Sequence, residues 1–316
     1  TQHSLDKMSF YYYDGDRLPC VMIVSVDDFL RTRSVDSNRD IVKDLFDLGS
    51  FEFGNDGETR FTGKEINTHR IDGKFKTHVT QREFTRALAP QKFQGDEHTE
   101  FRSCNGSLPW LAGRTRPDGD TSTSLANHGK DTGILEWKET DDTMEYTQQT
   151  EEVGIRFQAI PIDTDTVIVS FGDGSRANYH DSKSQEGILI TLTTPQCFKE
   201  KTPCGAIDWR SCKTTRVIRP TIAGKACAAD DTVEHAVHLN AFISGILHNE
   251  SAVHNPPWIR HAHATDFKSF SDAMVAENSN LEEKRVRITG RSFQEYLGTD
   301  SLHWVPTFLL FAYGLT

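Results

Sequence analysis

The sequence predicts an α/β protein in two parts: an α+β segment over residues 1–150, then a layered α/β domain over residues 154–316 with a mixed five-stranded sheet. Short runs of β-branched and aromatic residues recur along the whole chain, as they do in strands. One long amphipathic helical pattern runs from Ile222 to Leu247 between strand patterns, the order expected of a layered α/β domain. The length of 316 residues is enough for two domains, each with its own core.

The composition is that of a globular chain, with 36% hydrophobic residues. No apolar run approaches the roughly 20 residues that cross a bilayer, and Thr1 to Met8 lack the apolar core of a secretion signal. We therefore expect an intracellular protein, cytoplasmic or nuclear, without membrane contact. Because the chain starts with Thr almost directly on strand-like sequence, we expect it to be part of a longer polypeptide.

Charge and cysteine content narrow the function further. With 46 acidic and 35 basic side chains, the net charge is −11, which argues against a strong non-specific grip on nucleic acid because Lys and Arg supply that grip. The excess of acid is compatible with a metal-dependent site, which is itself built from carboxylates. The six cysteines contain no Cys-x-x-Cys pair, so we expect reduced thiols rather than structural zinc.

In the first part, apolar runs and turn residues predict short strands and helices. The expected elements are strands at 10–13 and 20–24, a helix at 37–48, a hairpin of strands 51–53 and 60–66 around Asn55-Asp56-Gly57, a strand at 76–79, a helix opened by the capping box Thr80–Glu83, and a helical piece at 107–112. Asp27 and Asp28 fall at the tip of a tight turn. Residues 91–103 resemble a loop, and residues 118–152 are polar and weakly patterned.

The apolar patterns that predict strands and helices are stronger in residues 154–316 than in residues 1–150. The expected elements of this second part are strands at 166–171, 187–193 and 206–211, the long helix at 222–247, a strand at 259–265, helices at 268–275 and 282–297, and a last strand at 302–305. This β-β-β-α-β-α-α-β order is typical of an α/β layered domain.

Two groups of carboxylates are candidates for chemistry. Asp27 and Asp28 repel one another at a turn, and a divalent cation such as magnesium would relieve that repulsion; a solvated turn is the plainer interpretation. Asp173 and Asp266 each follow a strand pattern, so each is either a cleft ligand or a turn residue. If the two converge, they suit a two-metal site for phosphoryl transfer.

Several motifs in the first part resemble copia-type retrotransposon reverse transcriptases. The segment Ser25-Val26-Asp27-Asp28-Phe29-Leu30 resembles the Y/H-V-D-D-[FIL]-L motif of that family. Further similar segments follow in the family's order: 44–49 (F-x-M-x-D-L-G region), 61–66 (F-L-G-I-x-I), 78–84 (I-S-Q-x-x-Y) and 106–118 (G-S-L-x-Y-L-A-x-x-T-R-P-D). This resemblance implies that residues 1–150 hold the end of a polymerase palm with thumb and connecting segments.

The second part resembles the ribonuclease H domain of the same polyprotein. The similar segments are 169–178 with 183–187 (S-D-A-S-x-A-N…K-S-Q-G-G), 265–269 (T-D-x-K-S), 303–307 (W-V-P-T) and 312–316 (A-D-G-L-T). The resemblance implies a ribonuclease H-like fold, with Asp27 and Asp28 serving nucleotidyl transfer and Asp173 and Asp266 serving hydrolysis of the RNA strand of a hybrid. It implies Mg²⁺ as cofactor, and RNA, DNA or an RNA–DNA hybrid and the rest of the Pol polyprotein as partners.

The departures from the family pattern concern the metal ligands. The family has a catalytic Glu at the start of the long helix, where this chain has Lys225, and a final Asp where this chain has Tyr313. An ammonium repels divalent cations, and loss of two ligands from a two-metal site costs orders of magnitude in rate. A palm also needs a third carboxylate from an earlier strand, which the chain as given does not contain.

The sequence thus predicts a catalytically degenerate relative of a reverse transcriptase and ribonuclease H. The alternatives are a non-catalytic nucleic-acid-binding module that keeps the fold, and a pseudogene product of marginal stability. His261 and His263 form a His-x-His pair, which suits metal binding but more simply a solvated strand face. Five basic residues are candidates for phosphate contact: Arg114, Arg116, Arg285, Arg287 and Arg291. The alternative interpretation is that they lie on exposed helix faces.

Overall fold

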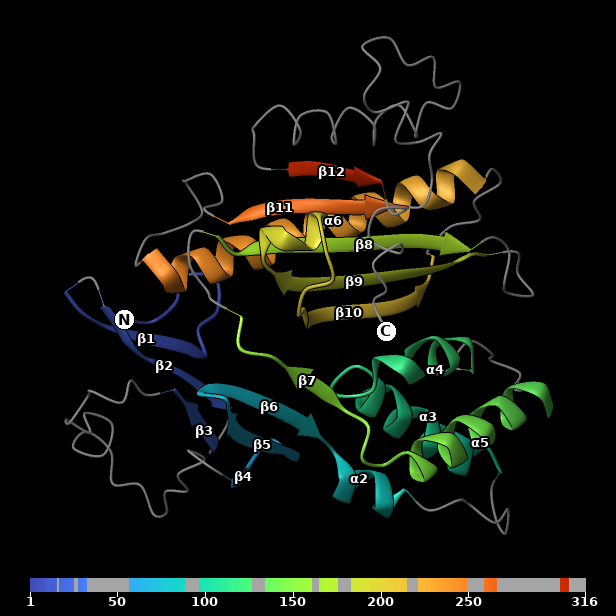
Figure 1. Cartoon of the computed structure of the whole chain (residues 1–316). Coiled ribbons are helices and arrows are strands. Elements are labelled where there is room, and N and C mark those ends of the chain that lie inside the picture. The colour runs from blue at the N-terminus through green and yellow to red at the C-terminus, as the bar shows by residue number, and fades with distance from the viewer. Residues whose placement is uncertain are drawn as a thin grey trace.

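The structure is a computed structural model, and the part of the chain that it describes forms three sheets and a group of helices (Figure 1). The described residues are 1–15, 17–25, 28–32, 57–88, 97–126, 134–160, 165–175, 183–214, 221–248, 259–265 and 302–306. For Pro19, Asn105 and the ranges 97–103, 134–136, 221–222 and 302–306, the backbone alone is described. The predicted helices at 37–48, 268–275 and 282–297 and the strand at 51–53 lie outside these ranges.

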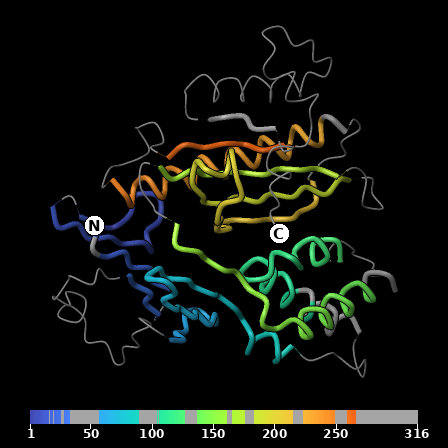
Figure 2. The backbone as a smooth tube through the Cα atoms, in the orientation of Figure 1, coloured from blue at the N-terminus to red at the C-terminus, as the bar shows by residue number. Residues whose placement is uncertain are grey.

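The largest sheet lies in the second part of the chain and confirms the α/β class. Its strands are β8 (Val167–Ser175), β9 (Gln185–Thr193), β10 (Gly205–Lys213), β11 (Arg260–Thr265) and β12 (Leu302–Pro306). They lie in the order β10-β9-β8-β11-β12, and the sheet is mixed, because β8, β9 and β10 are antiparallel while β11 is parallel to β8 and β12. Helix α6 (Thr221–His248) runs along one face of this sheet (Figures 1 and 2).

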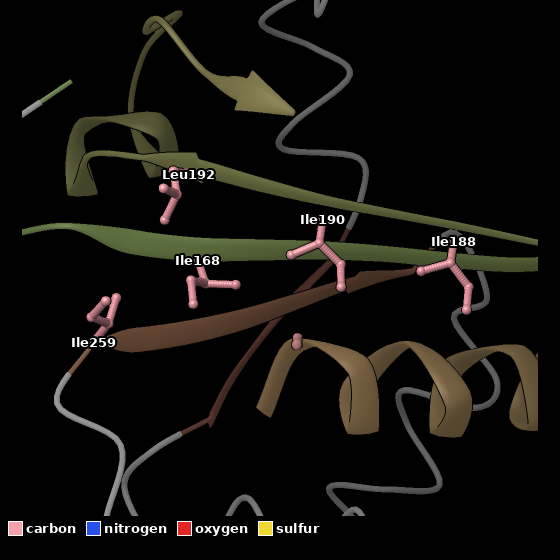
Figure 3. Close-up of a cluster of buried hydrophobic side chains, with 6 residues drawn as sticks. Ile168, Ile188, Ile190, Leu192 and Ile259 are labelled. Atoms are coloured by element: carbon pink, nitrogen blue, oxygen red, sulfur yellow. The ribbon is translucent and has the colours of Figure 1, made fainter. Parts of the chain in front are cut away.

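The core between this sheet and α6 consists of aliphatic side chains that alternate along the strands. Ile168, Ile188 and Ile190 point to the side of α6 and pack with Ala236 of the helix (Figure 3). The intervening residues Val167 and Val169 are also buried, on the other face, with the short helix η2 (Pro195–Phe198). Because both faces are covered along the first part of β8, residues 167–171 are apolar at every position except Ser170 rather than alternating.

The glycines of β8 bring this strand and α6 unusually close together. A Cβ atom at Gly172 would lie 2.4 Å from Thr232 Oγ1, and one at Gly174 would lie 2.8 Å from Gly224 O. Only residues without a side chain allow this approach. The end of β8 is therefore held against the first turns of α6.

The chain begins with a three-stranded antiparallel sheet that docks on the C-terminal half of α6. Its strands are β1 (Ser9–Asp14), β2 (Arg17–Ser25) and β3 (Asp28–Arg31), in that order. His3 Nε2 lies 3.0 Å from Phe242 O, and the Tyr13 hydroxyl donates a hydrogen bond to Ile246 O. The strands predicted at 10–13 and 20–24 are confirmed, and Asp28 is the first residue of β3, where it pairs with Ser25 of β2.

A four-stranded antiparallel sheet follows, with order β4-β5-β6-β7. Its strands are β4 (Gly57–Phe61), β5 (Lys64–Ile71), β6 (Lys74–Thr80) and β7 (Ile155–Phe157). The predicted single strand at 60–66 is wrong, because Thr62 and Gly63 form a turn with φ of 50° and 73°. A two-residue turn of this kind, with both φ positive, matches the twist of a hairpin. The strand β7, which follows the expected boundary at residue 154, pairs with β6.

The predicted capping box at Thr80–Glu83 does not cap a helix. Helix α2 (Arg82–Ala87) begins after Gln81, which makes no side-chain capping hydrogen bond. Glu65 from β5 takes that role instead: its carboxylate accepts hydrogen bonds from Arg82 N at 2.8 Å and Glu83 N at 3.1 Å. Thr80 donates its hydroxyl to the same carboxylate. A buried carboxylate from a neighbouring strand thus satisfies the free amides of the first turn.

Residues 97–103 and most of 118–152 are helical, contrary to the loop and the weak pattern predicted for them. The helices are α3 (Glu97–Ala112), η1 (Pro117–Gly119), α4 (Asp120–Ala126) and α5 (Ile134–Gln149). The buried face of α5 contains Thr140, Thr143, Met144 and Thr147. These positions have helical spacing, but three of them are polar by residue type, so hydrophobic periodicity does not reveal the helix. Within the described residues, no helix is both long and apolar enough to cross a bilayer.

Candidate functional site

Asp173 lies near the end of β8 on the face of the sheet that is turned away from α6. The glycines on either side of it face α6, and side chains alternate along a strand, so the carboxylate points to the opposite face. Its side chain is 64% exposed, and its Oδ1 accepts a hydrogen bond from Gly174 N at 2.8 Å. The carboxylate is thus available at the edge of a groove.

Lys225 reaches this carboxylate from the first turns of α6. Its Nζ lies 3.0 Å from Asp173 Oδ1, and the lysine side chain is 18% exposed. The close contact between Gly174 and Gly224, the residue before Lys225, brings the two side chains together. The family resemblance places a metal-binding Glu at the position of Lys225. In this chain the Lys225 ammonium instead contacts Asp173, the neighbouring candidate ligand.

The groove beside Asp173 lies between the five-stranded sheet and the helices of the first part. It has a volume of about 380 Å³ and an apolar floor that includes Phe171, Leu189 and Trp209. Asp173 and Thr265 line it together with Asp120 of α4. The groove therefore contains residues from both predicted parts of the chain.

Two contacts join the helices to the edge of the sheet at this groove. Trp209 Nε1 donates a hydrogen bond to Ala112 O at 2.9 Å, and Asp120 accepts one from Ser211 N. Burial raises the pKa of Asp120, although the hydrogen bond from Ser211 opposes the shift. Sequence reasoning did not single out Asp120 or connect it with Trp209, because no spacing rule links a helix at residue 120 with a strand at residue 209.

Asp28 lies in a different sheet from Asp173. It is exposed at the start of β3, and its Oδ2 accepts a hydrogen bond from Thr62 N at 3.2 Å, in the turn between β4 and β5. Of the candidate carboxylates that the structure describes, Asp28 therefore belongs to the sheet of β1, β2 and β3, and Asp173 to the five-stranded sheet.

Three of the candidate residues, Asp27, Asp266 and Tyr313, lie outside the described residues. Asp266 follows Thr265 in the sequence, and Thr265 lines the same groove as Asp173. The parallel register of β11 and β8 pairs Ala264 with Phe171, so these two strands end at the same edge of the sheet.

The described residues do not fit a two-metal centre. Within the described ranges, no three His, Cys, Asp or Glu side chains converge as metal ligands. The Lys225 ammonium already supplies a positive charge at the Asp173 carboxylate, and a divalent cation would be repelled from the same oxygen. The expected magnesium role remains a prediction for the ancestral site.

His261 and His263 are buried in the sheet rather than on the solvated strand face that the sequence favoured. Their side chains are 2% and 0% exposed, and the Ser170 hydroxyl lies 2.8 Å from His261 Nε2 and 3.0 Å from His263 Nδ1. Burial lowers the pKa of His261 to about 4 and that of His263 to about 3, where the neighbouring His261 adds to the shift. Both imidazoles are therefore neutral at pH 7. The covering of both faces of the sheet buries them, which strand periodicity alone does not reveal.

The two arginines of the segment Arg114-Thr115-Arg116 have different environments, and one of them is no candidate for phosphate contact. Arg116 is 1% exposed, and its guanidinium pairs with Asp118 at 2.8 Å and donates to Thr150 O at 3.0 Å. Arg114 is exposed, with its guanidinium 4.7 Å from the centre of the Trp110 ring. The interpretation as a phosphate contact thus fails for Arg116, because its donors are bound within the protein. Arg285, Arg287 and Arg291 lie outside the described residues.

Comparisons with known proteins give distant structural likenesses. No protein-family model and no curated protein sequence matches the chain. It is similar to ribonuclease H1 from the halophilic archaeon Halobacterium salinarum, at 10% identity over 44% of this chain and 84% of that one, with a TM-score of 0.28. It is also similar to the foamy viral protease-reverse transcriptase solved with an RNA/DNA hybrid, at 11% identity over 79% of this chain, with a TM-score of 0.44. The chain spans 29% of the length of that viral protein.

Proposed function

We propose that this chain is a catalytically degenerate fragment of a copia-type reverse transcriptase and ribonuclease H, ancestrally an RNA-directed DNA polymerase that also hydrolysed RNA–DNA hybrids. The observation that carries the proposal is the ion pair between Lys225 Nζ and Asp173 Oδ1, at 3.0 Å. A two-metal nuclease needs carboxylates around each ion to hold both metals against the phosphate. Here one ligand position supplies a cation, and the remaining carboxylate is bound to it.

The proposal includes two former catalytic centres, one for hydrolysis and one for nucleotidyl transfer. The second, around Asp173 and Asp266, is the former centre for hydrolysis of the RNA strand of a hybrid, with Lys225 and Tyr313 at degenerate positions. The first, around Asp27 and Asp28, is the former centre for nucleotidyl transfer. Asp28 is bound to the Thr62 amide, and Asp27 and Asp28 alone do not make the three-carboxylate centre of a palm.

The same proposal covers the organisation of the chain. We place the reverse-transcriptase part at residues 1–150 and the ribonuclease H-like part at residues 154–316, inside the cell. Magnesium belongs to the ancestral chemistry, and the partners are RNA, DNA or their hybrid together with the rest of the Pol polyprotein. The groove supports an association between the parts, because Asp120 and Trp209 come from either side of the boundary.

The test is hydrolysis of an RNA–DNA hybrid by the purified chain in Mg²⁺ or Mn²⁺. We expect no cleavage by the wild type, and cleavage by the double variant Lys225→Glu with Tyr313→Asp. The matched control is Lys225→Met with Tyr313→Asp, which removes the ammonium without adding the carboxylate and should stay inactive. Cleavage by the wild type that disappears in Asp173→Asn would overturn the proposal.

A non-catalytic nucleic-acid-binding module is the alternative, and the apolar floor of the groove favours it. Phe171, Leu189 and Trp209 line a surface beside a carboxylate whose charge is already compensated, so a nucleic acid could lie there without a metal. The two proposals differ in the restored variant. If Lys225→Glu with Tyr313→Asp binds a hybrid but cleaves nothing, the module is the better description.

A further inference from the structure

The hairpin of β5 and β6 ends in an arm, residues 69–76, in which every residue is exposed. The two strands stay in register up to the turn, and the paired residues are His69 with Lys76, Arg70 with Phe75, and Ile71 with Lys74. Asp72 and Gly73 form the turn, with φ of 52° and 77°, which matches the twist of a two-residue hairpin. The 69–76 arm therefore presents its side chains to solvent in a defined order.

Cations dominate the arm, although the net charge of the whole chain is −11. The arm contains Arg70, Lys74 and Lys76 against a single carboxylate, that of Asp72. Within the described ranges, none of these three cations forms an ion pair. The arginines of α2, beyond the other end of β6, are by contrast paired with glutamates: Arg82 with Glu58 and Arg86 with Glu151. The positive charge of the arm is thus not compensated by the described part of the protein.

An exposed aromatic ring lies among these cations. Phe75 stands between the two lysines in the sequence and is 47% exposed. The Arg70 guanidinium lies 5.6 Å from the centre of this ring, and its Nε donates a hydrogen bond to Gly73 O at 3.2 Å. The two contacts fix the guanidinium beside the ring. A ring with a planar cation beside it is a surface on which another planar group can stack.

The edge of β6 at the arm is open. Strand β7 pairs with β6 only at Thr77, His78 and Val79, so β5 is the one described strand that pairs with residues 74–76. Side chains alternate along a strand, which places Lys74 and Lys76 on the opposite face from Phe75. Because a lysine ends a flexible four-carbon stem, both ammonium groups can reach around this open edge to a ligand that lies on the ring.

We propose that the 69–76 arm binds single-stranded nucleic acid. A base stacks on Phe75 and the Arg70 guanidinium, and Lys74 and Lys76 neutralise the phosphates on either side of that base. The proposal rests on the nucleic-acid partners proposed above and names the place where an unpaired strand binds. Aromatic stacking and neutralisation of the backbone are the two contributions by which proteins hold single strands without reading their sequence.

The composition of the arm favours a single strand over other anionic partners. Asp72 lies at the tip, where a hairpin that enters a membrane would bury this carboxylate first, at a large cost in free energy. An acidic peptide would use the three cations and leave Phe75 in water. A single strand uses both kinds of group, since every unpaired base offers a flat face beside a phosphate.

The test measures the affinity of the full chain for a fluorescein-labelled oligothymidylate between about 50 and 200 mM KCl. In Lys74→Gln with Lys76→Gln, the salt slope of the binding constant should fall by about 0.7 for each cation removed. In Phe75→Leu, the affinity should fall at least about fivefold at every salt concentration while the slope stays unchanged, because stacking is lost and charge is not.

Two matched controls change the same chemistry elsewhere. Lys199 and Lys201 are also exposed and also two residues apart, so Lys199→Gln with Lys201→Gln removes the same charge at the end of η2. Trp110 is 41% exposed and has the Arg114 guanidinium 4.7 Å from the centre of its ring, so Trp110→Leu removes a comparable aromatic surface. Both control variants should keep the affinity and the salt slope of the wild type.

The outcomes separate this site from the proposed function. If the wild type binds neither the single strand nor an RNA–DNA hybrid, the proposed nucleic-acid partners are wrong and the site fails with them. If the wild type binds and the arm variants behave like the controls, the partners stand and the site is wrong. If the double lysine variant loses its cooperative melt, the single variant Lys76→Gln decides, with half of the expected change in slope.

Two competitors test the class of partner. Polyglutamate should displace the oligothymidylate poorly from the wild type, because it supplies charge without bases. Vesicles of phosphatidylserine and phosphatidylcholine should not bind through Phe75. Displacement by polyglutamate at the same concentration of charge, or vesicle binding that is lost in Phe75→Leu, would overturn the assignment to single-stranded nucleic acid.

Discussion

Lys225 on α6 and Asp173 on β8 form an ion pair of 3.0 Å at the edge of the groove, between a lysine that is 18% exposed and an aspartate that is 64% exposed. The pair exists because Gly174 and Gly224 let the strand and the helix approach. The family resemblance assigns a metal-binding carboxylate to the position of Lys225. In this chain the lysine neutralises the charge of Asp173 within the protein. The energetic and functional consequences of the ion pair can be measured separately.

The stability contributed by this ion pair should be small and sensitive to salt. In a double-mutant cycle of Lys225→Met and Asp173→Asn, we expect a coupling energy of about 0.2–1 kcal/mol at 0.1 M salt, because Asp173 is largely solvated. At 1 M salt the coupling should fall, because exposed charges are screened. Urea unfolding of the four proteins gives the value. A coupling that is unchanged by salt would contradict the exposed geometry.

Stability should decrease in acid because of His261 and His263. The pKa of each is lowered, to about 4 and about 3, against about 6.5 in the unfolded chain. The unfolded state therefore binds more protons below pH 6.5, and the free energy of unfolding falls as pH drops from 6.5 to 4, with the His263 contribution continuing to about 3. Each histidine contributes a slope of up to about 1.4 kcal/mol per pH unit.

NMR titration of the imidazole C–H signals tests this without a mutation. The two buried histidines should not titrate between pH 7 and 5. Titration of His261 and His263 near pH 6.5 would show that they are solvated, as the sequence suggested.

Replacing Gly172 by alanine should destabilise the protein by about 1–3 kcal/mol, because the new methyl group would lie 2.4 Å from Thr232 Oγ1 and 2.8 Å from Ala228 O. Either the strand or the helix must move. Chemical unfolding measures the loss. Gly187→Ala on the adjacent strand β9 is the matched control and should change stability by less than about 0.5 kcal/mol, since no atom lies within 4 Å of its Cβ position. Equal losses in both variants would rule out the close approach as the cause.

Substitution of the buried Arg116 should reduce the stability of the protein far more than substitution of the exposed Arg114. Arg116→Lys should cost about 2–4 kcal/mol, because a lysine reproduces neither the paired contact with Asp118 nor the bonds to the carbonyls of Thr147 and Thr150. Arg114→Lys should change stability by less than about 0.5 kcal/mol. Thermal unfolding of the two variants checks the difference, and similar melting temperatures would contradict the assignment of Arg116 as a buried tie between the helices.

Local patterns predicted much of the second part. The apolar runs of β8, β9 and β11 and the periodic face of α6 appear in the structure close to their expected bounds, because such patterns report which side of an element is buried. The helix α5 escaped prediction because threonines form much of its buried face. The hairpin turn at Thr62-Gly63 escaped because Thr is rarely found with positive φ.

The sequence by itself determined the α/β class, the long helix, most strands of the large sheet and the positions at which carboxylates of the resembled family are replaced. The tertiary structure decided which side chains meet: Glu65 with the amides of α2, Ser170 with two histidines, and Lys225 with Asp173. Periodicity reflects the environment of each residue within its own element. Burial of the histidines, capping from another strand and pairing of charges depend on elements that are distant in the chain, and only their packing brings these together.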